Sequence, residues 1–158
     1  MENQPVSKTV QESAVRLAQV MQPEDANPAG NVHGGTIMKL VDNAAYVVAV
    51  RHSRKNCVTL SIDSFKFHYP VYIGDLLIVK ASVNFVGNTS MEIGVKIEAE
   101  DLLKGTKRHT ASAYLTFVAL DENGKPTKVP RIIPQTLEEK RRYDEAKKRR
   151  ELRLSQLK

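Results

Sequence analysis

The second half of the chain alternates between apolar and polar residues, which predicts long β-strands. The alternation is strictest over residues 91–99, a pattern typical of an antiparallel strand with one face in water. Three other strand-like runs, about twice the usual strand length, are bounded by turns. They cover residues 57–67, 76–86 and 108–120. Residues 8–21 fit either a strand or a short helix, and we favour a strand.

One long helix is predicted before these strands, from Gly35 or Thr36 to His52. On a helical wheel its apolar residues spread over a wide arc, and the polar strip is narrow. Long antiparallel strands expose a broad apolar face that a single helix can cover. We therefore predict an α+β fold in which an antiparallel sheet curls around a central helix. Because the apolar arc is wider than one sheet covers, we also predict a homodimer.

The C-terminal residues differ from the rest in charge. We assign residues 1–135 to a single domain and residues 136–158 to a charged helical tail. Thr136 and Glu139 have the spacing of a capping box at the start of that helix. Residues 138–153 include eight basic and five acidic residues and few apolar ones. We therefore predict a solvated, partly frayed helix that adds little to the core.

Composition narrows the classes of function. The formal net charge of the 158 residues is +6, but about half of it lies in the tail, which weakens an inference to nucleic acid. Cys57 is the only cysteine, so no internal disulfide is possible, and we expect this residue to be buried. No apolar run reaches about 18 residues, and the first residues lack a signal-peptide pattern. We expect a cytoplasmic protein with no membrane or nucleic-acid partner.

Asp42 is unusual because it is a carboxylate within an apolar helix. On the helix alone it fits a surface residue paired with Lys39. The preceding loop, GNVHGG, favours another role, because Gly34 and Gly35 place backbone N–H groups at the helix start and Asn31 adds an amide. A carboxylate, an amide and a helix N-terminus can together hydrolyse an activated ester. Gly35 and Asp42 lie about 10 Å apart along the helix, so we expect a site that combines Asn31 and Gly35 of one chain with Asp42 of its partner.

The stretch NPAGNVHGGTIMKLVDNAA resembles the loop and helix of hotdog-fold acyl-CoA thioesterases, which include bacterial enzymes and the animal cytosolic or brain acyl-CoA hydrolase. The resemblance covers roughly residues 8–145 and includes FKFHYPVYIGDLL, VGNTSMEI and FVALDENGKP. It implies a hotdog fold, a trimer of dimers, and hydrolysis of acyl-CoA to a free acid and coenzyme A without a cofactor. It also implies that Asp42 is the catalytic acid, as general base or nucleophile, with Asn31 and the N–H of Gly35 beside the thioester carbonyl.

The resemblance further implies where coenzyme A binds. Relatives hold its pantetheine and nucleotide along the turn that matches GNTS, although this sequence alone also fits an ordinary hairpin turn. The residues of that turn here are Gly87, Asn88, Thr89 and Ser90. Basic residues that could contact the phosphates of coenzyme A are Arg51, Arg54, Lys104, Arg108, Lys128 and Arg131.

His33 and Gly34 are expected to shape the loop or contact the substrate. No metal site is predicted, because the other histidines are scattered along the sequence. Two other interpretations remain open. One is a non-catalytic acyl-CoA-binding or sensing protein with the same fold, and the other is a hotdog dehydratase. A dehydratase relies on a helix-associated histidine, and this helix offers only His52, at its end.

Overall fold

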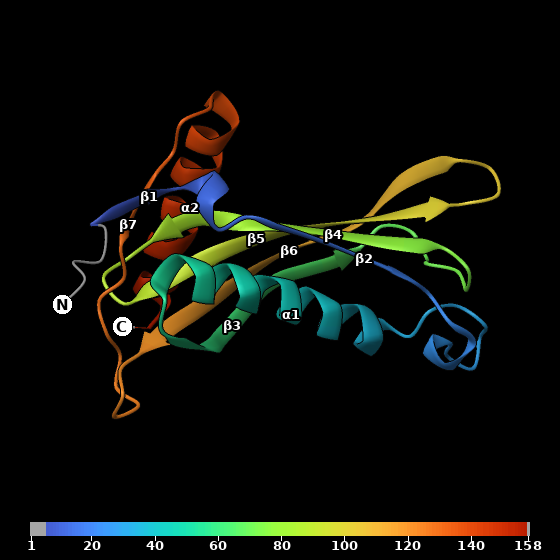
Figure 1. Ribbon diagram of the computed structural model, residues 1–158, viewed down its shortest axis with the longest axis horizontal. Helices are drawn as coiled ribbons and strands as arrows, with labels where there is room; N and C mark the ends of the chain where they lie inside the picture. The colour runs from blue at the N-terminus through green and yellow to red at the C-terminus, as the bar shows by residue number, and fades with distance from the viewer. Residues whose placement is uncertain (1–5, 158) are drawn as a thin grey trace.

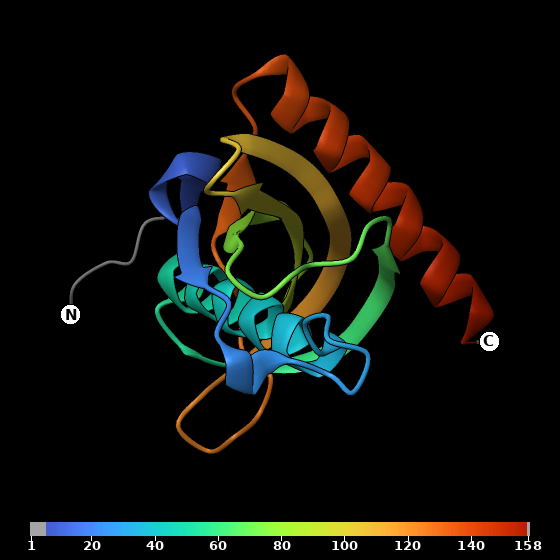
Figure 2. The same cartoon turned by 90° about the vertical axis from the view of Figure 1, so that its right-hand side faces the viewer.

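The structure, a computed structural model, describes residues 6–157. A five-stranded antiparallel sheet curls around one long helix, and a second helix lies outside the sheet (Figures 1 and 2). This arrangement confirms the predicted α+β hotdog fold. No helix within the described residues is long and apolar enough to cross a bilayer. The elements in chain order are β1 Ser7–Thr9, β2 Val15–Val20, α1 Gly34–Ser53, β3 Asn56–Phe67, β4 Leu76–Val86, β5 Ser90–Asp101, β6 Thr106–Leu120, β7 Arg131–Ile133 and α2 Leu137–Gln156.

The sheet has the strand order β2-β4-β5-β6-β3, which makes β2 and β3 its edges. Each predicted long strand is present, with ends that differ by at most two residues from the expected ranges. The register shifts twice along β3, once between β4 and β5, and once between β5 and β6. Such bulges bend strands and increase their twist. They allow the long strands to wrap around α1, as Figure 2 shows.

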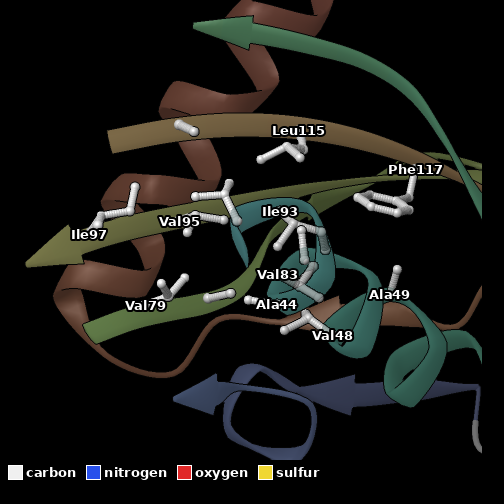
Figure 3. Packing of buried hydrophobic residues seen from close by; sticks show 14 of the residues in the cluster. Ala44, Val48, Ala49, Val79, Val83, Ile93, Val95, Ile97, Leu115 and Phe117 are labelled. Carbon is white, nitrogen blue, oxygen red and sulfur yellow. The ribbon is translucent and has the colours of Figure 1, made fainter. Parts of the chain in front are cut away.

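The core lies between α1 and the concave face of the sheet. Ala44, Val48 and Ala49 of α1 are fully buried and face Ile93 and the aromatic ring of Phe117 among others (Figure 3). Small side chains on the helix allow it to approach the sheet closely, and large side chains on the strands fill the remaining space. Cys57 is also buried, as expected.

Residues 8–21 do not form one strand, which corrects the sequence-based prediction. They form β1, a short 3₁₀ turn at Val10–Glu12, and β2. The Glu12 carboxylate accepts hydrogen bonds from the backbone N–H and the hydroxyl of Thr9, which stabilises the turn between the two strands. β1 pairs in parallel with β7, a three-residue strand too short to show an alternating pattern in the sequence.

Helix α2 is well formed and packs against the sheet on one side, which corrects the prediction of a solvated, partly frayed helix. It adds little to the core, as expected, because within Leu137–Gln156 the buried residues are Glu139 and Ala146, and neither belongs to the main hydrophobic cluster. It is a 20-residue helix with the expected capping box at Thr136, and it crosses the outer face of the sheet (Figure 2).

Arg149 donates two hydrogen bonds of 2.9 Å to the carboxylate of Glu92 on β5, whose side chain is 2% exposed. The Arg149 guanidinium also lies 3.7 Å from the centroid of the Tyr114 ring. Asn84 donates a further hydrogen bond to Glu92.

This docking predicts a loss of stability when Arg149 is removed. Arg149→Ala should lower the free energy of unfolding by about 3 kcal/mol, because Glu92 would remain buried without its counter-charge. Arg141→Ala is the matched control. Within residues 6–157 Arg141 pairs only with exposed carboxylates of the same helix, so its loss should change the free energy of unfolding little. Denaturant unfolding measures the free energy of unfolding of both variants. Equal, small effects would mean that α2 is only loosely attached.

Candidate active site

Asp42 lies on the side of α1 that faces strand β3. It is half-buried, and its Oδ1 atom accepts a hydrogen bond of 2.8 Å from Oγ1 of Thr59. No ion pair joins Asp42 to Lys39 in the described part of the chain, so the pairing considered for a surface aspartate is not formed. The register of β3 shifts directly after Thr59, where the strand bends. Thr59 was not singled out in the sequence, because a threonine at an exposed strand position carries no distinguishing signal.

At the start of α1, one backbone N–H group has no hydrogen-bond acceptor among the described residues. The Nδ1 atom of His33, the N-cap residue, accepts a hydrogen bond of 2.9 Å from the N–H of Gly35. Gly35 can therefore polarise a carbonyl only when the imidazole turns away. The N–H of Gly34 has no acceptor among the described residues, and Gly34 lines the neighbouring groove. The N–H of Gly34 is therefore the free backbone donor at this helix start among the described residues, and the predicted contact of the Gly35 N–H with the thioester carbonyl stays a prediction.

The loop before α1 is stabilised by the side chain of Asn27, a residue without a predicted role. Oδ1 of Asn27 accepts hydrogen bonds from the N–H groups of Ala29 and Asn31, at 3.0 and 3.1 Å. This side-chain turn is typical of Asn, and the sequence NPAGN could have indicated it. Asn31 is half-buried and pairs through its backbone with Tyr72. The structure thus places two asparagine side chains near the helix start.

A groove of about 370 Å³ opens at this end of the molecule. It is lined by the residues just described and by the β3–β4 loop, namely Asn27, Asn31, Val32, Gly34, Ile37, Phe67, His68, Tyr69, Pro70 and Val71. Arg108 holds that loop in place, because its guanidinium donates to the buried Asp75 carboxylate at 2.7 Å and to the Pro70 carbonyl at 3.1 Å. This engagement argues against the predicted role of Arg108 as a phosphate contact.

The histidines are less scattered than the sequence suggests. The rings of His68 and His109 lie 5.3 Å apart, next to the groove. His52 is fully buried at the end of α1, and its Nε2 atom lies 2.7 Å from the Pro130 carbonyl oxygen. Burial lowers the pKa of His52. Within residues 6–157 no three His, Cys, Asp or Glu side chains are grouped to hold a metal ion.

A second cavity of about 350 Å³ lies at the opposite end of α1. It brings together four of the residues predicted to contact coenzyme A, namely Gly87, Asn88, Lys128 and Arg131, with residues of α2. Thr89 and Ser90 complete the turn, and their carbonyl groups accept hydrogen bonds from Ala119 and Gly87. A 20-residue helix spans about 30 Å. The structure therefore places the 87–90 turn and the 31–35 loop of one chain at opposite ends of α1 (Figure 1).

Comparison with known proteins identifies relatives over nearly the whole chain. A sequence profile of the thioesterase superfamily matches residues 29–106. The cytosolic acyl coenzyme A thioester hydrolase of Rattus norvegicus is 38% identical over 147 residues, which are 92% of this chain and 39% of that protein. A solved apo-hexameric acyl-CoA thioesterase has a TM-score of 0.92 and 38% identity, with coverage of 96% of this chain and 97% of that one.

A second solved relative is informative about individual residues. The acyl-CoA hydrolase of Staphylococcus aureus, solved with butyryl coenzyme A, coenzyme A and coenzyme A disulfide, is 37% identical with a TM-score of 0.89, and the match covers 95% of this chain and 92% of that one. Alanine variants of that protein at an asparagine, an aspartate and a threonine have also been solved. Identity at this level over almost the full length of solved relatives shows that the chain belongs to the thioesterase superfamily, among its acyl-CoA thioester hydrolases.

Proposed function

We propose that the protein hydrolyses acyl-CoA to a free acid and coenzyme A. In this proposal Asp42 either activates a water molecule or itself attacks the thioester carbonyl carbon. The observation that carries this proposal is the hydrogen bond from Thr59 to the Asp42 carboxylate. In the Staphylococcus aureus relative, the substituted asparagine, aspartate and threonine have the same spacing along the chain as Asn27, Asp42 and Thr59 here. This spacing supports Asn27, in addition to the predicted Asn31, as a residue of the site.

Two chemical routes are open to Asp42. As a general base it takes a proton from water, whose oxygen adds to the thioester carbonyl carbon. The tetrahedral intermediate then breaks its C–S bond, and the proton passes to the coenzyme A thiolate. As a nucleophile Asp42 attacks that carbon directly, breaks the C–S bond and expels the coenzyme A thiolate to form an anhydride. Water then hydrolyses the anhydride, which releases the acid, regenerates the Asp42 carboxylate and supplies the proton for the thiolate. Neither route needs a cofactor.

The surroundings of Asp42 suit both routes. Thr59 binds Oδ1, while Oδ2 accepts no hydrogen bond from any residue in the described part of the chain. One carboxylate oxygen is therefore fixed and the other is available to react. The Gly34 N–H and an asparagine amide would stabilise the charge that develops on the carbonyl oxygen. His33 would contact the substrate once its ring leaves Gly35.

The proposed site requires a second chain. Strand β3 is a sheet edge, and its outward side chains Val58, Leu60 and Ile62 are exposed, with Leu60 at 67%. Met38 and Tyr46 of α1 extend this apolar surface next to Asp42. A surface of this kind marks an interface. In a two-fold dimer with antiparallel α1 helices, the helix start of one chain lies beside the middle of the other helix.

The likeness to a hexameric acyl-CoA thioesterase supports a trimer of such dimers. The name of the rat relative, a cytosolic enzyme, supports a cytoplasmic location. The other interpretations find less support. No observation favours a non-catalytic sensor. A dehydratase would need an accessible histidine on the helix, and His52 is fully buried and hydrogen-bonded to the Pro130 carbonyl.

Substitution of the site residues tests the chemistry. Asp42→Ala should remove nearly all hydrolysis and leave the melting temperature unchanged, because the carboxylate lies at the border of the core. Thr59→Val should lower kcat about tenfold, as expected for the loss of one hydrogen bond to a charged group. Asn27→Ala and Asn31→Ala should both lose activity. Free thiol release from several acyl-CoAs measures each effect, with the exposed Asn43→Ala on the same helix as control. Near-normal turnover in Asp42→Ala would refute the proposal.

The predicted interface can be tested by charge insertion. Leu60→Glu should split the dimer and abolish activity, because a carboxylate would be buried against the second chain. Leu103→Glu, at a hairpin position that is 99% exposed, should leave both assembly and activity intact. Light scattering and the thioesterase assay measure the two effects. A stable wild-type monomer at micromolar concentration would remove the basis for a shared site.

Complementation tests whether the site is shared. Asp42→Ala chains and Asn31→Ala chains are each expected to be inactive, and a mixed dimer would contain one intact and one doubly damaged site. Random pairing makes half of the dimers mixed, so about a quarter of wild-type activity should return after joint refolding. The same experiment with Asn27→Ala identifies which asparagine acts. If native mass spectrometry shows mixed dimers but neither mixture gains activity, the site lies within one chain.

A further inference from the structure

Helix α2 crosses the outer face of the sheet toward its β3 edge. Along the helix, Tyr143 stacks on a phenylalanine of β4, and Arg149 contacts β5 and β6. Arg153, one turn later, forms an ion pair with Asp63 of β3. These contacts follow the order of the strands across the sheet, β4-β5-β6-β3. The helix therefore reaches the edge of the sheet at Arg153.

Leu157, which follows α2 directly, lies beyond this edge. Four helical residues advance about 6 Å, more than the ~4.8 Å between neighbouring strands. At about 100° per residue, Leu157 is rotated only about 40° from Arg153, so it belongs to the sheet-facing side of the helix. Glu139 and Ala146 on that side are buried, whereas Leu157 is 82% exposed. Figure 2 shows the C-terminal end of α2 extending past β3.

The outer face of β3 offers an exposed apolar side chain at this edge. Val58 is opposite Val118 of β6. Glu92, which points outward to Arg149, is opposite Thr116, two residues earlier on β6. Because alternate strand residues share a face, Val58 lies on the same outer face that α2 crosses. Its side chain is 47% exposed.

Leu157 does not reach Val58 of its own chain. The helix meets β3 at Asp63, and five strand residues separate Val58 from that point by roughly 15 Å. The exposed apolar stretch of β3 is centred on Leu60, the side chain of which is 67% exposed. If two β3 edges pair antiparallel around a two-fold axis beside Leu60, the partner's Val58 lies opposite Ile62. This position is next to the point where α2 leaves the sheet.

We propose that the last turn of α2 packs across the dimer interface onto the outer face of the partner's β3, with Leu157 against the partner's Val58. This inference rests on the dimer described under the proposed function. The occupant is a second copy of the chain, because the exposed end of α2 is continuous with the apolar β3 edge. The ion pairs of Arg149 and Arg153 hold α2 on its own sheet. The helix therefore joins two sheets, and two-fold symmetry forms the contact twice.

Chemical cross-linking tests which chain Leu157 contacts. Leu157→Cys/Val58→Cys is made in a Cys57→Ala chain, which has no other thiol. A short bismaleimide should give a covalent dimer on denaturing electrophoresis. Ser155→Cys/Val58→Cys should stay monomeric, because residue 155 is rotated about 200° from Arg153 and faces away from the sheet. A link within one chain, equal linking in both variants, or no link in a protein shown to be dimeric would overturn the proposal.

Subunit exchange tests the contribution of the contact to assembly and keeps Cys57 in place. Leu157→Glu should exchange subunits with isotopically labelled chains about tenfold faster than wild type in native mass spectrometry, because its carboxylate would be buried against the partner. Ser155→Glu is the matched control and should exchange at the wild-type rate. It adds the same charge to the same turn on the exposed side of the helix. Equal exchange by the two variants would overturn the proposal.

The two experiments also separate this inference from the proposed function. A wild-type protein that is monomeric in light scattering would overturn the shared active site and the α2 contact together. A wild-type dimer without the cross-link and without faster exchange in Leu157→Glu would overturn the α2 contact alone. Absence of thioester hydrolysis would overturn the proposed function, whereas cross-linking and exchange report on assembly whether or not the protein is active.

Discussion

The packing of α1 into the concave sheet is the contact on which the other features depend. The buried side of the helix consists largely of alanine and valine, so the helix axis can lie close to the strands. This close packing fixes the directions of all other side chains on the helix. It holds Asp42 at the rim, where Thr59 of the edge strand reaches it, and it holds the helix start against the β3–β4 loop. A looser core would leave the carboxylate and the amide donors without fixed positions.

The length of α1 sets the second constraint. The helix separates the open Gly34 amide from the 87–90 turn by its full length, so one chain cannot place both on one small thioester. The exposed apolar edge of β3 lies between these two ends, beside Asp42. Dimerisation through that edge would cover the exposed apolar side chains of β3. It would also bring the start of one α1 helix close to the opposite end of the other.

The sequence predicts those features that depend on regular local patterns. The strict alternation around Ile93 and Val95 predicts the strands, and a carboxylate among apolar helical residues draws attention to Asp42. Features that depend on contacts between distant segments leave no regular pattern in the sequence and are therefore not predicted. Arg149 and Glu92 are 57 residues apart, so nothing in the charged C-terminal sequence indicates that one arginine is buried against the sheet. Thr59 resembles any other polar residue on an exposed strand position.

The helix start shows a further limit of reasoning from residue types. Two adjacent glycines predict open backbone donors, but two identical residues carry no signal for which amide the loop leaves free. The structure decides this through His33, whose imidazole takes the place that a serine or aspartate side chain usually has at a helix N-cap. The histidine thus distinguishes two chemically identical glycines, one capped and one open. A donor that is already aligned and lacks an acceptor needs no rearrangement when charge develops nearby, and such alignment is the main source of electrostatic stabilisation in an active site.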